Sequence, residues 1–314
     1  MTLILSEKDV EDLINMKDVV SSVEEAFRRQ GEGEISNLMR TRSRGSSSTL
    51  SVMHANLPYL RRGGLKAYVS SGAGTKFALL LFDTYNSDLL AVMGADILGR
   101  FRTGAASGVA TKHLYGRPSG TLALFGTGRQ ALTQVLATME VMSLDAVRVW
   151  SPTPEHRKAF ALELKNRGIN GGAFDTPAMA LDGADIATAI TSSKRPFLTE
   201  KMLRNVSHLN IAGGNFPDHS EITPAAVGAF GTVAVDDLSQ AKIEYGDLIQ
   251  AANDGAFTWH SAVELGAMVA GKKKPQGRTL FKSGGAAFED VAVAAMIYER
   301  ATKSGGSYPS VELV

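Results

Sequence analysis

Leu122-Ala-Leu-Phe-Gly126-Thr-Gly128-Arg-Gln130-Ala131 is the stretch that decides how this chain folds. An apolar run ends abruptly at Gly126, and a run compatible with a helix begins at Gln130, which predicts a strand, a tight turn and a helix. In the GxGxx(G/A) pattern the first glycine permits the turn and the second lets backbone N–H groups approach a pyrophosphate. The helix N-terminus adds partial positive charge. A plain structural turn is the alternative, but the flanking strand and helix favour a dinucleotide site.

Beyond this turn, strand-like apolar runs alternate with helical patterns. Such alternation predicts parallel strands joined by right-handed helical crossovers. We therefore expect an α/β fold with a doubly wound parallel sheet of the Rossmann type. The expected strands are 146–150, 184–191, 207–213 and 232–236, and the expected helices are 153–166, 243–252, 261–270 and 288–301.

The residues before the turn predict a second set of elements. Ser6 and Asp9 form a capping-box-like start for a helix, and residues 17–29 carry apolar side chains at helical spacing. The segments that read as strands are 3–5, 49–53, 64–70, 77–82 and 89–93, the last two forming a hairpin.

A helix with an unusual composition follows this hairpin. It contains Gly104 and Gly108, and a glycine costs about 1 kcal/mol in a helix interior. We expect close packing against another backbone or a ligand to compensate. Gly116-Arg-Pro118-Ser-Gly120 then indicates a domain boundary just before the decisive strand.

The predicted cofactor site lies at the carboxyl ends of the parallel strands, where open sheets bind ligands. The second strand of a dinucleotide-binding unit often ends in an acidic residue that binds the adenosine ribose. Here that end carries Ser151, Thr153 and Arg157 and no carboxylate that would repel a 2′-phosphate. We therefore expect NAD or NADP, with a lean toward NADP or toward indifference. The predicted cofactor-binding residues are Gly126, Thr127, Gly128, Arg129, Gln130, Ser151, Thr153, Arg157, Thr191, Ser192, Gly214, Ser283 and Gly284.

Basic residues before the turn have two interpretations. Spacing alone favours a solvated strand edge for Arg40 and Arg42, because basic residues discourage edge pairing. Lys66, inside an apolar run, either extends its amine to solvent or serves a site. Arg102, near the start of the glycine-containing helix, is a candidate anion binder.

Composition excludes several classes of function. The chain has 314 residues, room for two domains, and its net charge of +1 gives no pull toward nucleic acid or anionic membranes. It has no cysteine, and its six histidines show no HxxxH or HxH spacing, so we expect no metal site. No segment resembles a signal peptide or a transmembrane helix, and GxSxG is absent. These features predict a soluble cytoplasmic protein.

Several separated stretches together resemble the ornithine cyclodeaminase/mu-crystallin family, over nearly the whole chain. The matching stretches are Arg40-Thr41, Gly64-Leu-Lys66-Ala67, Arg102-Thr-Gly-Ala-Ala-Ser, Gly126-Thr-Gly-Arg-Gln-Ala, Ala212-Gly-Gly-Asn215 with Glu221, Val235-Asp236 with Glu244-Tyr-Gly-Asp247, and Phe281-Lys-Ser-Gly-Gly-Ala-Ala-Phe-Glu-Asp290.

The resemblance implies a discontinuous α+β substrate-binding and dimerisation domain, residues 1–115 plus 286–314, with a Rossmann domain of residues 116–285 inserted in it. It also implies NAD(P) and a homodimer. In that family, residues matching Arg40, Lys66 and Arg102 hold the carboxylate of an amino or imino acid, and the lysine is placed either to polarise the substrate or to shuttle a proton. It thus favours a site role for Arg40 and Lys66, whereas Arg42 stays the weaker candidate.

Two departures from the family pattern bear on the reaction. Asn215 stands where cyclodeaminases and alanine dehydrogenases of this family carry an aspartate, and an amide cannot act as a base. Ser51 stands where cyclodeaminases carry a glutamate. His54 replaces an expected proline, as a ligand contact or simply a loop residue.

The favoured prediction is an NAD(P)-dependent oxidoreductase that moves hydride to or from the Cα of a small imino or amino acid, either a ketimine reductase or an amino-acid dehydrogenase. Its predicted catalytic residues are Lys66, Arg40, Arg102 and Asn215. The alternatives are ornithine cyclodeaminase, a lyase with bound NAD, and a mu-crystallin-like protein that binds NADPH and a ligand without turnover. The sequence leaves the substrate side chain open.

Overall fold

The structure, a computed structural model that describes residues 1–312, has two compact units. Unit 1 consists of Met1–Arg102 and Gly285–Val314, and unit 2 of Thr103–Gly284. The second boundary lies next to the predicted one, but the first falls inside helix α3 (Asp96–Ala110) and not at residue 115. The reason is packing: Gly104 and Gly108 bring the second half of α3 against α4 (Ala131–Val141) of unit 2.

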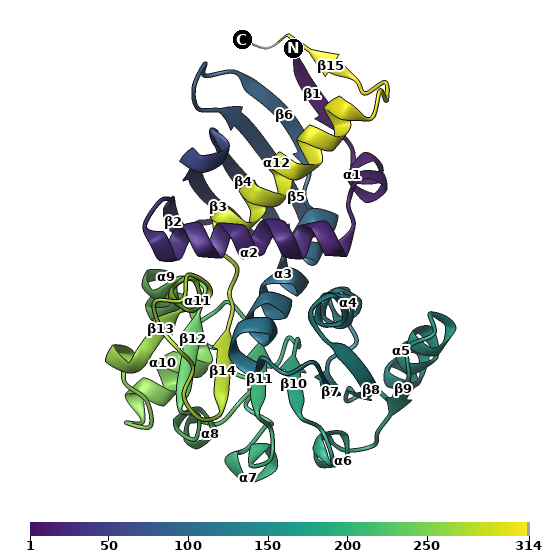
Figure 1. Ribbon diagram of the computed structural model, residues 1–314, viewed down its shortest axis with the longest axis vertical. Coiled ribbons are helices and arrows are strands. Elements are labelled where there is room, and N and C mark those ends of the chain that lie inside the picture. Colours follow the sequence, from purple (N-terminus) through teal and green to yellow (C-terminus); the bar gives the residue numbers. More distant parts are fainter. Residues whose placement is uncertain (313–314) are drawn as a thin grey trace. The chain divides into compact units, whose positions relative to one another are not determined.

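Unit 1 is a seven-stranded sheet with helices, in the strand order β15-β1-β6-β5-β4-β3-β2 (Figure 1). The Ser6–Asp9 capping box, the second helix and the β5–β6 hairpin are confirmed. Its elements are β1 (Thr2–Leu5), α1 (Glu7–Leu13), α2 (Met16–Glu32), β2 (Ser36–Arg44), β3 (Ser48–Leu57), β4 (Arg62–Ser71), β5 (Gly74–Asp83), β6 (Leu89–Gly94), α12 (Ala287–Lys303) and β15 (Ser310–Val311), besides the first half of α3.

The inner face of this sheet is covered by helix α12. Helix α12 crosses β2 to β5 on the inner face, where a row of paired residues runs Leu5, Met93, Leu79, Lys66 and Met53. Strand side chains alternate between faces, so a lysine in this row is directed into the interior. The observed register therefore places Lys66 under α12, not toward solvent.

Unit 2 is an eight-stranded parallel sheet in the order β13-β12-β14-β11-β10-β7-β8-β9. Its elements are β7 (Ser119–Phe125), α4, β8 (Ser143–Trp150), α5 (Pro154–Asn166), β9 (Gly171–Ala173), α6 (Pro177–Leu181), β10 (Ile186–Ala189), α7 (Glu200–Leu203), β11 (His208–Ile211), α8 (Pro224–Gly228), β12 (Thr232–Val235), α9 (Leu238–Glu244), α10 (Gly246–Asn253), β13 (Ala262–Glu264), α11 (Leu265–Val269) and β14 (Thr279–Lys282). The order reverses between β7 and β10, which confirms the doubly wound, Rossmann-type prediction.

Two helix predictions in this unit are wrong in detail. The helix expected over 243–252 is divided between α9 and α10, and the one expected over 261–270 begins with strand β13 before α11. Ala262 pairs with Val233 of β12, so tertiary pairing at the sheet edge overrides the local helical pattern.

The glycines of α3 provide a test of this packing. A Cβ at Gly104 would lie 2.7 Å from the carbonyl carbon of Thr133 in α4, whereas a Cβ at Gly99 of the same helix would meet no atom within 4 Å. We expect Gly104→Ala to lower the free energy of unfolding by about 1–3 kcal/mol through overpacking. The control Gly99→Ala should raise it by up to about 1 kcal/mol. Denaturant titration measures both, and equal effects would contradict the close approach.

A buried histidine makes unit 2 sensitive to acid. His208 is fully buried between Thr279 Oγ1 (2.8 Å from Nδ1) and Asn210 Oδ1 (3.1 Å from Nε2). Burial lowers the pKa of His208 from 6.5 to about 4. Between these values the unfolded chain binds the proton and the folded chain does not, so acidification favours unfolding.

The expected loss for His208 is about 3 kcal/mol of unfolding free energy between pH 7 and pH 4. His208→Gln keeps hydrogen-bonding groups without titrating, and it should flatten this part of the pH–stability curve. Curves of the same slope for both proteins would rule out His208 as the source.

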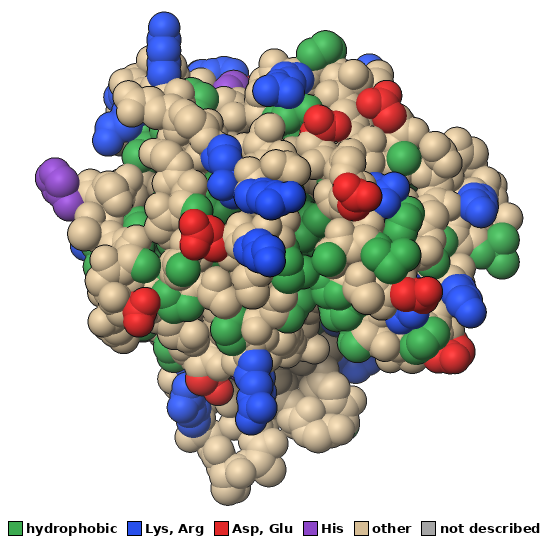
Figure 2. All heavy atoms as spheres, turned by 90° about the horizontal axis from the view of Figure 1, so that it is seen from below, with side chains coloured by type: hydrophobic (Ala, Val, Ile, Leu, Met, Phe, Trp, Pro, Cys, Tyr) green, Lys and Arg blue, Asp and Glu red, His purple; other side chains and the backbone are tan. Residues whose placement is uncertain are grey.

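Surface charges are mixed in sign. On the face drawn in Figure 2, acidic side chains lie among the basic ones. Within residues 1–312, no helix is both long and apolar enough to cross a membrane.

Candidate functional site

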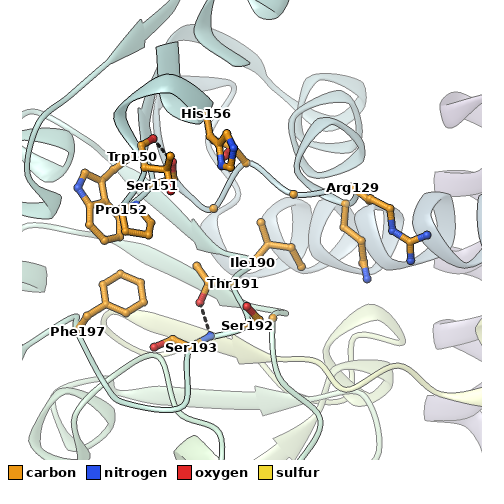
Figure 3. A pocket seen from close by; sticks show the side chains of 16 residues that line it. Arg129, Trp150, Ser151, Pro152, His156, Ile190, Thr191, Ser192, Ser193 and Phe197 are labelled. Carbon is orange, nitrogen blue, oxygen red and sulfur yellow. Dashed lines mark hydrogen bonds between the residues drawn. The ribbon is translucent and has the colours of Figure 1, made fainter. Parts of the chain in front are cut away.

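A cavity of about 590 Å³ lies in unit 2 at the carboxyl ends of β7, β8 and β10 (Figure 3). Nine of the residues predicted to bind a cofactor line it: Gly126, Thr127, Gly128, Arg129, Gln130, Ser151, Thr153, Thr191 and Ser192. The sequence missed the remaining lining residues, which are Trp150, Pro152, His156, Ile190, Ser193, Phe197 and Gly213. Trp150 ends β8, and Pro152, Ile190 and Gly213 lie within two residues of the end of a strand, so strand ends alone would have indicated these four. Phe197 gave no such signal, and its ring lies 5.4 Å from that of Trp150.

The turn after β7 fits a dinucleotide. Gly126 has a φ of +102°, and a Cβ there would lie 2.5 Å from the carbonyl oxygen of Ile190. A Cβ at Gly128 would meet no protein atom within 4 Å, so protein packing does not require glycine at this position, whereas close approach of a ligand would. Helix α4 begins without a side-chain cap. The Ala131 N–H donates to the Gly128 carbonyl oxygen at 2.9 Å, so what this helix end offers to phosphate oxygens is its partial positive charge.

The β8 end of the cavity carries hydroxyl and imidazole groups. Ser151, Thr153 and His156 line it, and no aspartate or glutamate is among the lining residues. Arg157 does not line the cavity: its guanidinium donates to the Ser151 carbonyl oxygen (3.1 Å) and pairs with Asp175 (2.6 Å). Arg157 therefore supports the loop that follows β8 and is not among the residues that line the cavity.

Three further predicted residues also lie outside this lining. The carbonyl oxygen of Gly214 accepts from Lys282 Nζ at 2.8 Å. The Ser283 hydroxyl and the Gly284 N–H donate to Asp236 Oδ2 at 2.9 and 3.0 Å. Asp236 also accepts from the Tyr245 hydroxyl. These bonds hold the segment that follows β14, and a sequence motif does not show such partners.

A cluster of charged side chains lies in unit 1 on the inner face of the sheet. Lys66 Nζ is 2.6 Å from Asp290 Oδ2, and Arg102 Nε is 2.9 Å from Asp290 Oδ1. Arg102 Nη1 is 2.9 Å from Glu289 Oε2. Arg40 donates to the Gly285 carbonyl oxygen at 3.1 Å and contacts Met53 Sδ at 3.7 Å. All five charged side chains are buried, so the structure brings together the three predicted cations.

The electrostatics of this cluster depend on burial and on mutual proximity. Burial lowers the pKa of Lys66 to about 8; Arg102 and Arg40 act in the same direction, and Asp290 opposes them. Burial raises the pKa of Asp290, but the two cations it contacts outweigh burial and hold this pKa below its usual value. Among these five side chains, three cations face two carboxylates, which leaves one excess positive charge for an anion.

Two members of this cluster were not predicted as site residues. Asp290 and Glu289 lie in the first turn of α12, where acidic residues are favoured in any helix. Because of this general preference, their sequence position does not reveal that they also pair with buried cations. In the structure both carboxylates are buried, and Asp290 pairs with two cations.

The remaining candidates are placed as follows. Asn215 is half-buried in the loop after β11 of unit 2. Ser51 is buried beside Tyr68 on the inner face of unit 1. His54 is part of strand β3 and not of a loop, and it is exposed on the outer face, opposite to Lys66. Within residues 1–312, no three His, Asp or Glu side chains are grouped to hold a metal.

Comparison with known proteins places this geometry in context. The model of the ornithine cyclodeaminase/mu-crystallin family matches residues 1–305. Alanine dehydrogenase of Archaeoglobus fulgidus is 31% identical, with 98% of this chain and 97% of that protein covered. The Δ1-pyrroline-2-carboxylate reductase of Thermococcus litoralis, solved with NADH and L-proline, has a TM-score of 0.91 and 31% identity over 99% and 100% of the two chains. An archaeal alanine dehydrogenase dimer with bound NAD has a TM-score of 0.88 and 28% identity over 98% and 100%.

Proposed function

The chain belongs to the ornithine cyclodeaminase/mu-crystallin family, and from this premise we propose that it is an NAD(P)-dependent oxidoreductase. Its substrate is a small imino or amino acid, and hydride moves to or from the Cα, as in a ketimine reductase or an amino-acid dehydrogenase. The observation that carries this proposal is the buried cluster of Arg40, Lys66 and Arg102 around Asp290.

The charges of this cluster suit a substrate carboxylate. Two guanidinium groups and an ammonium donate several charge-assisted hydrogen bonds, and a carboxylate offers two oxygens to accept them. Burial strengthens this attraction because screening by water is weak there. Asp290 fixes the direction of both Lys66 and Arg102, so the donors are oriented before the substrate binds.

We assign separate roles in ketimine reduction to the cavity of unit 2, to Lys66 and to Asn215. A dinucleotide held by the cavity of unit 2 would supply the hydride. As the carbon of the C=N bond accepts that hydride, the nitrogen gains a proton and becomes an amine. Lys66, with its pKa near 8, is protonated at neutral pH and is the group we assign as proton donor. Asn215 is assigned a hydrogen-bonding role toward the substrate, since an amide cannot act as a base.

The cyclodeaminase alternative is weaker because of the same residues. Ornithine carries a second ammonium group, and Ser51 on the inner face provides a hydroxyl in place of a carboxylate. Asn215 likewise provides no negative charge. The third possibility, a binding protein without turnover, does not require a lysine whose pKa lies near neutrality.

The test is a reaction panel. The protein is incubated with NADH or NADPH and with cyclic ketimines such as Δ1-pyrroline-2-carboxylate, or with 2-oxo acids and ammonia, while the absorbance of the reduced nicotinamide is followed. Oxidation of the cofactor supports the proposal. Proline and ammonia formed from ornithine with catalytic NAD would establish the lyase, and binding of NADPH without any oxidation would establish the binding protein.

We further propose that the cavity accepts NADP(H) and prefers it to NAD(H). The support is the hydroxyl and imidazole lining at Ser151, Thr153 and His156, without a carboxylate to repel a 2′-phosphate. In the same panel, a lower KM for NADH than for NADPH would overturn this preference without affecting the proposed reaction.

We also propose a homodimer through the outer face of the unit 1 sheet. A row of paired residues on this face runs Ile4, Val92, Leu80, Leu65, His54 and Leu38. Leu38 and the neighbouring Leu50 and Val69 are 53%, 43% and 44% exposed, an apolar surface of the kind that protein partners cover. Light scattering distinguishes a dimer from a monomer, and Leu50→Glu should favour the monomer.

A further inference from the structure

A single buried carboxylate in unit 2 joins two neighbouring strand ends. Glu221 is 1% exposed, and its Oε1 accepts from the N–H of Thr191 at 2.7 Å and from the Thr191 hydroxyl at 2.6 Å. Its Oε2 accepts from the N–H of Gly213 at 3.1 Å. Thr191 follows β10 and Gly213 follows β11, so the carboxylate ties the two loops together.

Both loops belong to the wall of the cofactor cavity. Thr191 and Gly213 line it, and so does Phe197, whose N–H donates to the Glu221 carbonyl oxygen at 3.1 Å. The Thr191 hydroxyl also accepts a hydrogen bond from the Ser193 N–H at 3.1 Å (Figure 3). Both hydrogen bonds of this hydroxyl are therefore made within the protein, and Thr191 contributes to the site by shaping the cavity wall.

A second layer of charges holds Glu221 in place. Asp247 Oδ1 accepts from the N–H groups of Glu221 and Ile222 at 2.6 and 3.2 Å. Lys282 Nζ lies 3.0 Å from Asp247 Oδ2 and donates to the Gly214 carbonyl oxygen. Lys282 and Asp247 both act on the Glu221 carboxyl electrostatically, and both are buried.

The hydrogen bonds around Glu221 distinguish its two protonation states. Both carboxylate oxygens face donors, so the ionised form satisfies every contact, whereas a proton on either oxygen would point at an N–H or O–H group. Burial raises the pKa of Glu221 to about 7; Asp247 adds to this, while Lys282 and Thr191 oppose it. The carboxylate of Glu221 therefore changes its charge near neutral pH.

We propose that Glu221 is a positioning residue of the dinucleotide site, whose ionised carboxylate holds the ends of β10 and β11 in the arrangement that binds the cofactor. This inference rests on the proposed assignment of the cavity to NAD(P). Protonation of Glu221 loosens the tie between Thr191 and Gly213 and lowers the fraction of molecules that is ready to bind.

The test is the affinity of the full chain for NADH, measured by nicotinamide fluorescence from about pH 6 to about pH 8. If only the ionised form binds, the apparent Kd is the intrinsic Kd divided by the ionised fraction, which predicts a rise of about 10-fold from pH 8 to pH 6. Glu221→Gln cannot ionise, so it should bind at least about 10-fold more weakly than the wild type at pH 8 and lose this pH dependence. Thr191→Val removes one donor to the carboxylate, so the midpoint of the pH dependence should move to higher pH.

Two controls separate Glu221 from other groups. Glu264→Gln removes a carboxyl of unit 2 that accepts from the Leu238 N–H and does not line the cavity, and it should keep the pH dependence. His156→Gln removes the histidine of the cavity and should also keep it. If Glu221→Gln does not fold, as judged by circular dichroism, the wild-type profile and Thr191→Val decide the matter.

The outcomes identify which proposal fails. Absence of NADH binding at every pH would overturn the dinucleotide site itself. A wild-type Kd that stays constant across this pH range, or a pH dependence retained in Glu221→Gln, would overturn the role of Glu221 alone. Loss of the dependence in His156→Gln would assign it to the histidine.

Discussion

Replacing Lys66 with alanine is expected to lower turnover by about 10³-fold and to leave the affinity for NADH unchanged. The lysine is buried, contacts Asp290, and belongs to unit 1, whereas the dinucleotide cavity belongs to unit 2. Its loss removes both the proposed donor to the substrate carboxylate and the proposed proton source. Steady-state kinetics with a cyclic ketimine measures the first effect, and nicotinamide fluorescence measures the second.

The dependence of turnover on pH tests the role of Lys66 independently. Because the pKa of Lys66 is about 8, ketimine reduction should decline as the pH rises through about 8 and the ammonium loses its proton. Lys76→Ala is the matched control, since Lys76 is an exposed lysine on the adjacent strand β5. A Lys66→Ala protein that has lost NADH affinity would instead assign the lysine to the cofactor site or to folding.

Replacing Asp290 with asparagine is expected to lower the free energy of unfolding by about 3–5 kcal/mol, because it leaves two buried cations without their shared carboxylate. Lys66 and Arg102 both contact Asp290, and all three side chains are buried. The substitution also removes a group that raises the pKa of Lys66. The decline of ketimine reduction should therefore move to lower pH.

An exposed ion pair provides the comparison for Asp290. Lys8 and Asp12 form an i,i+4 pair whose side chains are 71% and 60% exposed. Such pairs contribute less than about 1 kcal/mol, so Asp12→Asn should scarcely change stability. Urea titrations of both variants decide the matter: if Asp290→Asn is as stable as Asp12→Asn, the cluster does not depend on Asp290.

The strand, turn and helix around Gly126 could be predicted from the sequence because their determinants are local. Gly126, Gly128 and Ala131 lie within one strand–turn–helix segment, and the positive φ of Gly126 is a property that only glycine tolerates well. Arg157 shows the limit of such local reasoning. It lies at the expected strand end, but Asp175 and the Ser151 carbonyl oxygen hold its guanidinium, and partners of this kind have no motif.

The cation cluster could not be predicted from spacing alone, for two physical reasons. The register of β2 against β3 shifts between Leu38 and Thr41, and a bulge of this kind redirects the side chains within it, here that of Arg40. The carboxylates come from α12, far away in the sequence. Resemblance to the family indicated the three cations, whereas only the fold shows what Asp290 and Glu289 contribute.

The discontinuity of unit 1 has a consequence for the order in which the protein is made. On the ribosome, Arg40, Lys66 and Arg102 are synthesised early, and Asp290 and Glu289 follow only after the whole of unit 2. Until then Lys66 and Arg102 lack the carboxylates that pair with them, so we expect the inner face of the sheet to stay hydrated. We therefore expect helix α12 to complete the proposed substrate site and the core of unit 1 late in folding.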